Sequence, residues 1–269
     1  MDNAAHSFQI VGSDSDSDGR CPAADRTERF DGRPRPTHIP MQIHQAWDTL
    51  PPPRRWAHTM ASVRRWHPDW QYKLWNRDES LAYIRERHPD LYPSFAAYNR
   101  QIMRCDVMRY ALMYDQGGMY CDLDYEFIRP YDYGDAQLVL GYEMDLAWGD
   151  PLEQVASYFF ASAPGHPLWR DILDELIARP PHTETYREVV NATGPGLLTR
   201  VFTANCHRYE GAVLEPRLVF SPYRIRGSRE KATLLNNGQT VGIHHASGSW
   251  KERWTATYFK AKLAKRRTE

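Results

Sequence analysis

Residues 101–126 read QIMRCDVMRYALMYDQGGMYCDLDYE, and this stretch decides the fold. Apolar residues dominate positions 102–114, which predicts a helix, and the glycine pair at 117–118 supplies the stop that helix C-termini favour. Residues 119–124 then alternate as a strand does, so that successive side chains point to opposite faces. The stretch therefore predicts a helix that leads through a tight turn into a strand.

Two carboxylates, those of Asp122 and Asp124, leave the same face of the expected strand where its apolar run stops. In open α/β sheets, ligands bind at the carboxyl ends of the strands. Paired carboxylates there suit a hard divalent cation that also holds phosphate oxygens. Because a D-x-D tripeptide often occurs by chance, a solvated strand end is the alternative interpretation.

A charged pair lies on the expected helix that precedes the strand. Asp106 and Arg109 are spaced i and i+3 and so share one face. Ile102 and Met113 belong to the same face, so the pair is expected to sit within an apolar surface. Since burying a charged pair is costly unless it has partners, the pair indicates contact with a ligand.

Size and composition indicate a globular, enzyme-like chain. It has 269 residues, of which 42% are hydrophobic, which fits one large domain or two small ones with a buried core. The formal net charge is zero and no basic field covers the chain, which argues against nucleic acid as a partner. The four cysteines form no CxxC pair, which argues against a zinc ribbon.

The two ends of the chain differ from its middle. The N-terminus carries no apolar signal segment, and no run reaches the roughly 18 apolar residues of a membrane-spanning helix, so we expect a soluble or cytoplasmic protein. Residues 1–37 are expected to form a disordered polar tail, residues 38–250 the domain, and residues 251–269 a basic C-terminal helix or tail. For that basic run, a solvated helix end is favoured over contact with a membrane surface.

Alternation and helical spacing place the elements of the domain. Up to the aspartates their order is β-α-β-α-α-β, which favours a mostly parallel sheet with helices on its faces. The expected strands are 39–47, 70–76, 119–124, 137–143, 157–163, 212–220 and 241–245, and the expected helices are 56–66, 78–87, 102–114, 169–177 and one beginning near Gly196.

Trp47 ends the first expected strand. Its indole can pack in the core, as most tryptophans do. Beside a metal site it can instead stack on a nucleotide base, an interaction worth roughly 1–3 kcal/mol. Spacing alone leaves both interpretations open.

His244 and His245 end the last expected strand, and Ser249 and Trp250 follow them. One imidazole can complete a metal shell or donate to phosphate, and the sequence leaves open which of the two does so. Ser249 and Trp250 can close over a bound diphosphate, as a mobile C-terminal lid would.

The turn at residues 193–196 precedes an expected helix. It can present backbone N–H groups to a polar ligand, with an ordinary loop and N-cap as the alternative.

Five motifs occur in a fixed order along the chain: IPMQIHQAW, WQYKLWN, IMRCDVMRYALMYDQGGMYCDLD, TGPG and HHASGSW. Together they resemble the D-x-D sugar transferases grouped as glycosyltransferase family 32, which include fungal α-1,6-mannosyltransferases and inositol-phosphoceramide mannosyltransferases. The resemblance runs from about residue 38 to residue 250. It rests on the combination, because any one motif alone is weak.

The resemblance implies a GT-A type α/β fold: a mostly parallel mixed sheet flanked by helices, with a Rossmann-like nucleotide-binding core. It also implies Mn²⁺ or Mg²⁺ as cofactor and retention of the anomeric configuration. The expected reaction moves a hexose from a nucleotide-diphosphate sugar, GDP-mannose or a UDP-hexose, to a hydroxyl of a glycan or glycolipid. The alternatives are a metal-dependent phosphohydrolase or nucleotide-sugar hydrolase, and a sugar-binding module without catalysis.

The family's residue roles carry over by position. The expected metal ligands are Asp122, Asp124 and His245, and the expected catalytic residues are Asp106, Arg109, Asp122 and Asp124. The acceptor is expected at the TGPG turn, on Thr193, Gly194 and Pro195. The donor is expected to contact residues from several motifs: Gln45, Trp47, Asp106, Arg109, Tyr120, Asp122, Ser249 and Trp250. No carboxylate stands out as a covalent nucleophile, so we predict front-face attack by the acceptor.

Overall fold

The computed structural model describes residues 8–9, 38–144, 152–180, 183, 185–222, 233 and 236–248. Three predictions fall outside these ranges: nearly all of the tail over residues 1–37, the basic helix over residues 251–269, and the lid formed by Ser249 and Trp250. Within the described ranges, no helix is both long and apolar enough to cross a bilayer.

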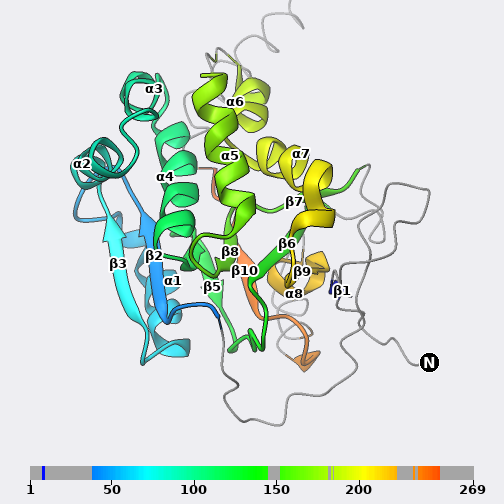
Figure 1. Ribbon diagram of the computed structural model, residues 1–269. Coiled ribbons are helices and arrows are strands. Elements are labelled where there is room, and N and C mark those ends of the chain that lie inside the picture. The colour runs from blue at the N-terminus through cyan, green and yellow to red at the C-terminus, as the bar shows by residue number, and fades with distance from the viewer. Residues whose placement is uncertain are drawn as a thin grey trace, which may run out of the picture.

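A mixed sheet of eight strands forms the centre of the protein (Figure 1). Its strands follow the order β1-β9-β6-β8-β4-β2-β3, and β7 pairs with β6 off this path. Strands β3, β2 and β4 are parallel, as are β6 and β9, whereas β8 is antiparallel to both β4 and β6. The α/β class predicted from the sequence is confirmed. The strands of this sheet are β1 (Phe8–Gln9), β2 (Gln42–Ala46), β3 (Gln71–Trp75), β4 (Gly118–Cys121), β6 (Leu138–Met144), β7 (Gln154–Val155), β8 (Phe159–Ser162) and β9 (Ala212–Glu215).

A second, two-stranded sheet joins distant parts of the chain. Strand β5 (Tyr125–Phe127) pairs antiparallel with β10 (Gly242–His244), and His244 lies opposite Tyr125. This pairing brings the late histidines beside the segment that follows β4.

Helices cover both faces of the central sheet. Helices α4, α5 and α7 pack on one face, and α1 and α8 pack on the other (Figure 1). The helices are α1 (Ala57–Trp66), α2 (Arg77–Arg87), α3 (Tyr92–Ala97), α4 (Gln101–Asp115), α5 (Pro167–Ala178), α6 (Tyr186–Ala192), α7 (Pro195–Asn205) and α8 (Arg217–Phe220).

A hydrophobic core lies on each face of the central sheet, and the side chains of its strands point alternately into one core and the other. Tyr120 of β4 and Phe160 of β8 belong to the core beneath α4, whereas Met119 and Phe159 belong to the core on the opposite face. This is the two-sided burial expected of central strands in an α/β protein. It also confirms the prediction that Met119 and Tyr120 point to opposite faces.

The glycine pair turns the chain from α4 into β4. The Gly117 N–H donates to the carbonyls of Leu112 and Met113 at 3.2 and 3.1 Å, which ends the helix. Both glycines have positive φ, +65° at Gly117 and +86° at Gly118. A Cβ on Gly118 would lie 2.5 Å from the Gln42 carbonyl oxygen, so no other residue fits this turn without strain.

The strand predicted over residues 119–124 is shorter than expected and ends at Cys121. Its antiparallel partner sets the limit, because Cys121 pairs with Phe159 and the Asp122 N–H makes a last bond to the Tyr158 carbonyl at 2.9 Å. The Tyr125 N–H then donates to the Asp122 carbonyl at 3.0 Å and closes a turn. The two aspartates therefore lie in a turn at the carboxyl end of β4, not on a strand face.

The strand predicted over residues 212–220 is also wrong in its second half. Strand β9 ends at Glu215, and residues 217–220 form the short helix α8. Pro216 separates the two, since its ring fixes φ near −55° and it has no N–H to continue the ladder.

Candidate active site

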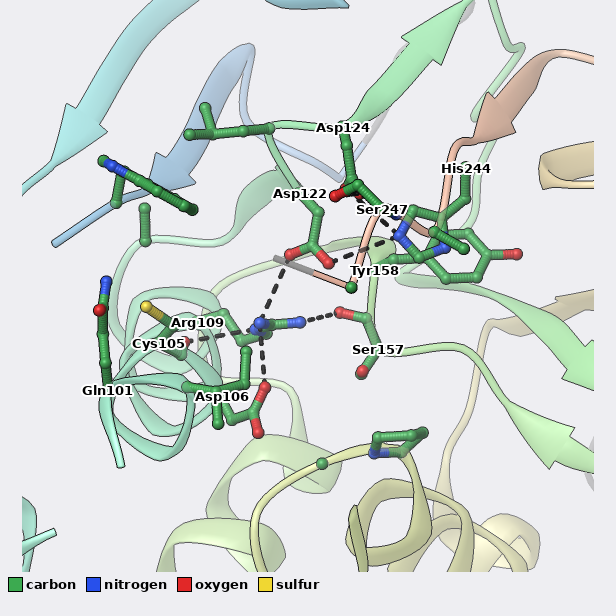
Figure 2. A pocket seen from close by; sticks show the side chains of 18 of the residues that line it. Gln101, Cys105, Asp106, Arg109, Asp122, Asp124, Ser157, Tyr158, His244 and Ser247 are labelled. Atoms are coloured by element: carbon green, nitrogen blue, oxygen red, sulfur yellow. Dashed lines mark hydrogen bonds and ion pairs between the residues drawn. The ribbon is translucent and has the colours of Figure 1, made fainter. Parts of the chain in front are cut away.

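A cavity of about 380 Å³ lies where β4 and β10 end (Figure 2). Its walls come from α4, the turn after β4, the loop after β10, the start of α7 and the residues that follow β2. The polar side chains in Figure 2 come from segments far apart in the sequence and converge on this space. Of the residues predicted from sequence, nine line it: Trp47, Asp106, Arg109, Tyr120, Asp122, Asp124, Gly194, Pro195 and, from the histidine pair, His244.

Asp122 uses one of its carboxylate oxygens for protein contacts. Its Oδ1 accepts a hydrogen bond from the Tyr120 hydroxyl at 3.0 Å and lies 3.4 Å from Arg109 Nη2. Its Oδ2 faces His244, whose Nε2 is 3.9 Å away. The carboxylate is thus oriented from one side and leaves Oδ2 directed at the imidazole.

Asp124 is held in the same manner by the loop after β10. The backbone N–H and the hydroxyl of Ser247 both donate to Asp124 Oδ2, at 2.9 and 2.7 Å. Its Oδ1 lies 3.3 Å from His244 Nε2. The imidazole of His244 stacks on the Tyr158 ring with centroids 4.2 Å apart, and its backbone N–H donates to Ser221 Oγ at 3.0 Å.

One atom from each of Asp122, Asp124 and His244 can therefore meet at a common point. These ligand atoms lie within 4.8 Å of one another. Two carboxylate oxygens and one imidazole nitrogen suit Mn²⁺ and related divalent ions. The remaining carboxylate oxygens are already occupied by Tyr120 and Ser247, which is the outer support that metal ligands commonly have.

Arg109 is the buried cation of the site. Only 2% of it is exposed, and its Nη2 lies 3.0 Å from Asp106 Oδ1. Its Nη1 donates to the Ser157 carbonyl, its Nε donates to the Cys105 carbonyl at 3.3 Å, and its guanidinium lies 4.6 Å from the centre of the Tyr120 ring. The predicted burial of this charged pair is confirmed, and the structure supplies the partners that burial requires.

Thr193 takes a different place from the one expected. It is fully buried, and its hydroxyl donates to Asp106 Oδ2 at 2.9 Å, while its carbonyl accepts from the Tyr110 hydroxyl at 2.8 Å. Gly194 and Pro195 line the cavity, whereas Thr193 does not. Thr193 therefore positions Asp106 and has no surface for direct contact with an acceptor.

Gln45 likewise positions other residues. It is fully buried beneath the turn, where its Nε2 donates to the Asp122 carbonyl at 3.1 Å and its Oε1 accepts from the Tyr72 hydroxyl at 2.7 Å. Trp47 reaches the cavity itself. Its half-buried ring packs edge-on against Trp56 with centroids 6.0 Å apart, so one part is packed while another remains accessible.

The environment shifts the acid–base properties of these groups. Burial raises the pKa of Asp106 to about 7, against the opposing effects of Arg109 and the Thr193 hydroxyl. Burial also raises the pKa of Asp122, with Arg109 again opposing. For Asp124, burial by itself would raise the pKa. The hydrogen bonds from His244 and Ser247 outweigh this effect, and the pKa of Asp124 lies below its usual range. Asp124 is therefore the aspartate of this turn most firmly held as an anion.

His245 lies away from the cavity, although it was expected among the metal ligands. Its Nε2 is 2.9 Å from Glu126 Oε2, on the side of the small sheet away from the paired aspartates. Successive side chains of an extended segment point in opposite directions, so when His244 faces Asp124, the next residue must face elsewhere. The structure thus selects His244 from the pair that the sequence left open.

Sequence reasoning missed several contributors to the site, among them Ser247 and Glu143. Ser247 lies inside the HHASGSW motif, yet nothing local shows that it reaches Asp124. Glu143 lines the cavity from the end of β6. Its place there follows from the sheet order and has no local signal.

Part of the chain matches a known family of sugar transferases. Residues 53–140 match the family model described as "Glycosyltransferase sugar-binding region containing DXD motif". The matched segment includes Asp106, Arg109, Asp122 and Asp124. This match agrees with the resemblance to D-x-D sugar transferases predicted from the sequence, over about a third of the chain.

The chain is similar in sequence to mannosyltransferases of yeasts. The chain is 29% identical over 219 residues to inositol phosphoceramide mannosyltransferase 1 of Schizosaccharomyces pombe, covering 79% of this chain and 62% of the relative. It is 29% identical over 177 residues to the mannosyl phosphorylinositol ceramide synthase SUR1 of Saccharomyces cerevisiae, covering 64% and 44%. The initiation-specific alpha-1,6-mannosyltransferase of Candida albicans is 21% identical over 235 residues, covering 74% and 59%. The chain thus spans less than two thirds of the length of these relatives.

Two solved structures are similar at a lower level. PaToxG glycosyltransferase aligns with 15% identity and a TM-score of 0.47, covering 64% of this chain and 71% of that one. A glycosyltransferase involved in the glycosylation of the major capsid of PBCV-1 aligns with 12% identity and a TM-score of 0.41, covering 79% and 96%.

Proposed function

We propose that this chain is a metal-dependent, retaining glycosyltransferase. It would move a hexose from a nucleotide-diphosphate sugar to a hydroxyl of a glycan or glycolipid acceptor. The observation that carries the proposal is the convergence of Asp122, Asp124 and His244 on one wall of a cavity that also contains the buried Arg109–Asp106 pair. The name of the matched family, a sugar-binding region with a DXD motif, supports the same activity.

Among donors, GDP-mannose is the first choice, with UDP-hexoses as the alternative. The support comes from the relatives, which are named for mannosyl transfer. Two of those relatives are named for an inositol-phosphate ceramide or its mannosylated form, so a lipid of that kind is the first acceptor to test.

The metal site fits the donor's diphosphate. Asp122, Asp124 and His244 would hold the ion, with their orientation fixed by Tyr120, Ser247 and Tyr158. A bound divalent ion would supply Lewis-acid stabilisation of the leaving diphosphate. Arg109 is fixed in the same cavity wall and would stabilise charge that develops near Asp122.

The accessible part of Trp47 lines the cavity and would stack on the donor base, with the sugar between the turn and α4. In the reaction, the acceptor oxygen bonds to the anomeric carbon as the bond from that carbon to the diphosphate breaks. The hydroxyl proton passes to the departing phosphate oxygen. Attack on the face from which the diphosphate leaves gives retention without a covalent intermediate.

Glu143 provides the test of that last step. Among the carboxylates of the described residues that line the cavity, it is the one to which the proposal gives no role. Front-face attack predicts that no glycosyl adduct forms on Glu143 when donor turnover is stopped and the protein is analysed by mass spectrometry. An adduct on this side chain would instead establish a double displacement.

Nucleotide release tests the activity itself. Purified protein is incubated with Mn²⁺ and either GDP-mannose or UDP-hexoses, with and without an inositol-phosphate glycolipid, and both nucleotide and sugar products are measured. Transfer predicts that nucleotide release and glycosylated lipid appear together. Release with free sugar only would indicate the hydrolase, and binding without release would indicate the sugar-binding module.

The variant Asp124→Asn should lower transfer by about 100-fold or more, the scale of losing a group that stabilises developing charge. Its matched control is Asp174→Asn, the same change in an ion pair that is half exposed on α5. The control should retain activity. Equal activity of both variants would reject the D-x-D assignment.

A further inference from the structure

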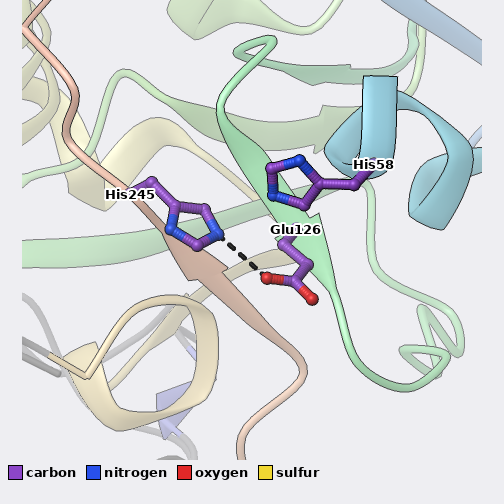
Figure 3. Close-up of side chains that lie close together, drawn as sticks. All are labelled: His58, Glu126 and His245. Carbon is purple, nitrogen blue, oxygen red and sulfur yellow. Dashed lines mark hydrogen bonds and ion pairs between the residues drawn. The ribbon is translucent and has the colours of Figure 1, made fainter. Parts of the chain in front are cut away.

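Three residues outside the cavity form a second cluster of metal-ligand type (Figure 3). They are His58 on α1, Glu126 on β5 and His245 just after β10, and their side chains point toward one another. His245 Nε2 lies 2.9 Å from Glu126 Oε2, and the two imidazole centroids are 5.7 Å apart. One ligand atom from each residue lies within 4.8 Å of the others.

This cluster is separate from the D-x-D site although the two share strands. His244 and His245 are successive residues and so point to opposite sides, while Asp124 lies in the turn before β5 and Glu126 lies on the strand itself. Asp124 and His244 face each other at the cavity, and Glu126 contacts His245 outside it. None of the three cluster residues lines the cavity.

The backbone fixes the cluster before any ligand binds. The Phe127 N–H donates to Ser62 Oγ at 2.9 Å, which joins β5 to the helix that carries His58. The His245 N–H donates to the Asp124 carbonyl at 3.0 Å. A site whose ligands are held by independent contacts loses little conformational entropy when an ion binds.

The ring nitrogens also suit coordination. His58 Nδ1 lies 3.1 Å from the Arg55 carbonyl oxygen. With the proton on Nδ1, the ring donates to that carbonyl, and Nε2 keeps its lone pair for a metal. Such a second hydrogen bond is usual for metal-bound imidazoles.

We propose that His58, Glu126 and His245 form a Zn²⁺ site. Two imidazoles and one carboxylate are a common three-residue set for zinc, with the remaining position taken by water. His58 and His245 are exposed, so the ion and its water are accessible from solvent. Mg²⁺ prefers oxygen ligands, so this set discriminates against it.

The bound ion would fasten the loop after β10 to β5 and α1. Ser247 lies two residues beyond His245 and donates twice to Asp124, so the zinc site and the D-x-D turn share one loop. Zinc would stabilise the arrangement in which Ser247 holds the carboxylate. This inference does not depend on the sugar-transfer reaction.

Zinc binding is measured directly on the full chain after removal of metal, by competition with a chromophoric chelator. The Asp124→Asn background weakens the D-x-D site and isolates the second one. In that background, we expect one Zn²⁺ per chain, and a further His58→Ala change should weaken binding at least about 10-fold, as expected when one ligand of a metal is lost. The matched control is His207→Ala, another exposed histidine, which should bind as the parent does.

Thermal stability and the spectrum of bound Co²⁺ test the same site independently. In the wild-type background His58→Ala should lower the zinc stoichiometry by one, and Zn²⁺ should raise the Tm of the wild type more than that of the variant. Bound Co²⁺ should show visible ligand-field bands that His58→Ala removes. Unchanged zinc affinity and stoichiometry in His58→Ala would leave only a surface His–Glu contact and overturn the proposal. Because these measurements need no turnover, a failure of the proposed transferase activity would be seen separately.

Discussion

The guanidinium of Arg109 compensates buried negative charge at the centre of the molecule, so replacing it gives the sharpest stability test. In Arg109→Met the side chain keeps much of its volume but loses the charge. Asp106, which is 3% exposed, would lose its ion pair at 3.0 Å, and the carbonyl of Ser157 would lose its donor. Removing one partner of a buried ion pair typically costs about 3–5 kcal/mol, so we expect a loss of that size in the free energy of unfolding.

The loss should depend on pH in a defined direction. In the wild type the pKa of Asp106 is raised to about 7 by burial, and Arg109 acts to lower it. Without Arg109 the folded-state pKa rises further above the unfolded value. When the pKa of a group is higher in the folded than in the unfolded protein, the group stabilises the fold at pH values below its pKa in the unfolded protein. That contribution is lost as the pH rises through its pKa in the folded protein. The difference between variant and wild type should therefore shrink by about 1–2 kcal/mol between pH 8 and pH 5.5, since each unit of pKa corresponds to about 1.4 kcal/mol.

Urea unfolding followed by far-UV circular dichroism at both pH values measures these quantities. The matched control is Arg170→Met, which removes an equally sized cation from a half-exposed pair on α5 and should change stability by at most about 1 kcal/mol. If Arg109→Met does not fold at pH 8, the double variant Asp106→Asn/Arg109→Met removes both charges and should recover the fold. A loss below 1 kcal/mol, or one with no pH dependence, would refute the argument from the buried pair.

Three further predictions test single contacts. Thr193→Val should cost about 1–3 kcal/mol in urea unfolding because it leaves a buried oxygen of Asp106 without its donor, whereas Thr193→Ser should not. Gly118→Ala should lower the free energy of unfolding by about 1–3 kcal/mol, because φ is +86° and the new Cβ meets the backbone of β2. The control Gly165→Ala should cost less, because φ is also positive there but no atom lies within 4 Å of the new Cβ. Trp47→Ala should raise the KM for the nucleotide donor by roughly 5- to 150-fold, the equivalent of one stacked base, and an unchanged KM would remove Trp47 from the donor site.

Local patterns predicted most of the elements near their observed positions. The helix over residues 102–114 is α4, and the stop at the double glycine holds because positive φ is needed there. The strands over residues 70–76 and 137–143 correspond to β3 and β6. These predictions succeed because periodicity reflects burial of one face or of both faces of an element.

Short elements were missed where local signals are weak. Helix α3 has six residues and β7 has two, below the length at which periodicity is visible. Helix α6 did carry a readable signal, the capping box formed by Thr185 and Glu188, and sequence reasoning overlooked it.

The sequence by itself determined that a buried charged pair on α4 would precede two aspartates at the carboxyl end of β4. Spacing along one helix and one strand contains that information. Only the tertiary structure decided that His244, and not His245, faces Asp124, and that Thr193 and Gln45 support the site from beneath. The reason is that strand register and turn position depend on hydrogen bonds between β5 and β10, which are separated by more than a hundred residues. A shift of that register by one residue would exchange the two histidines, and no local pattern fixes it.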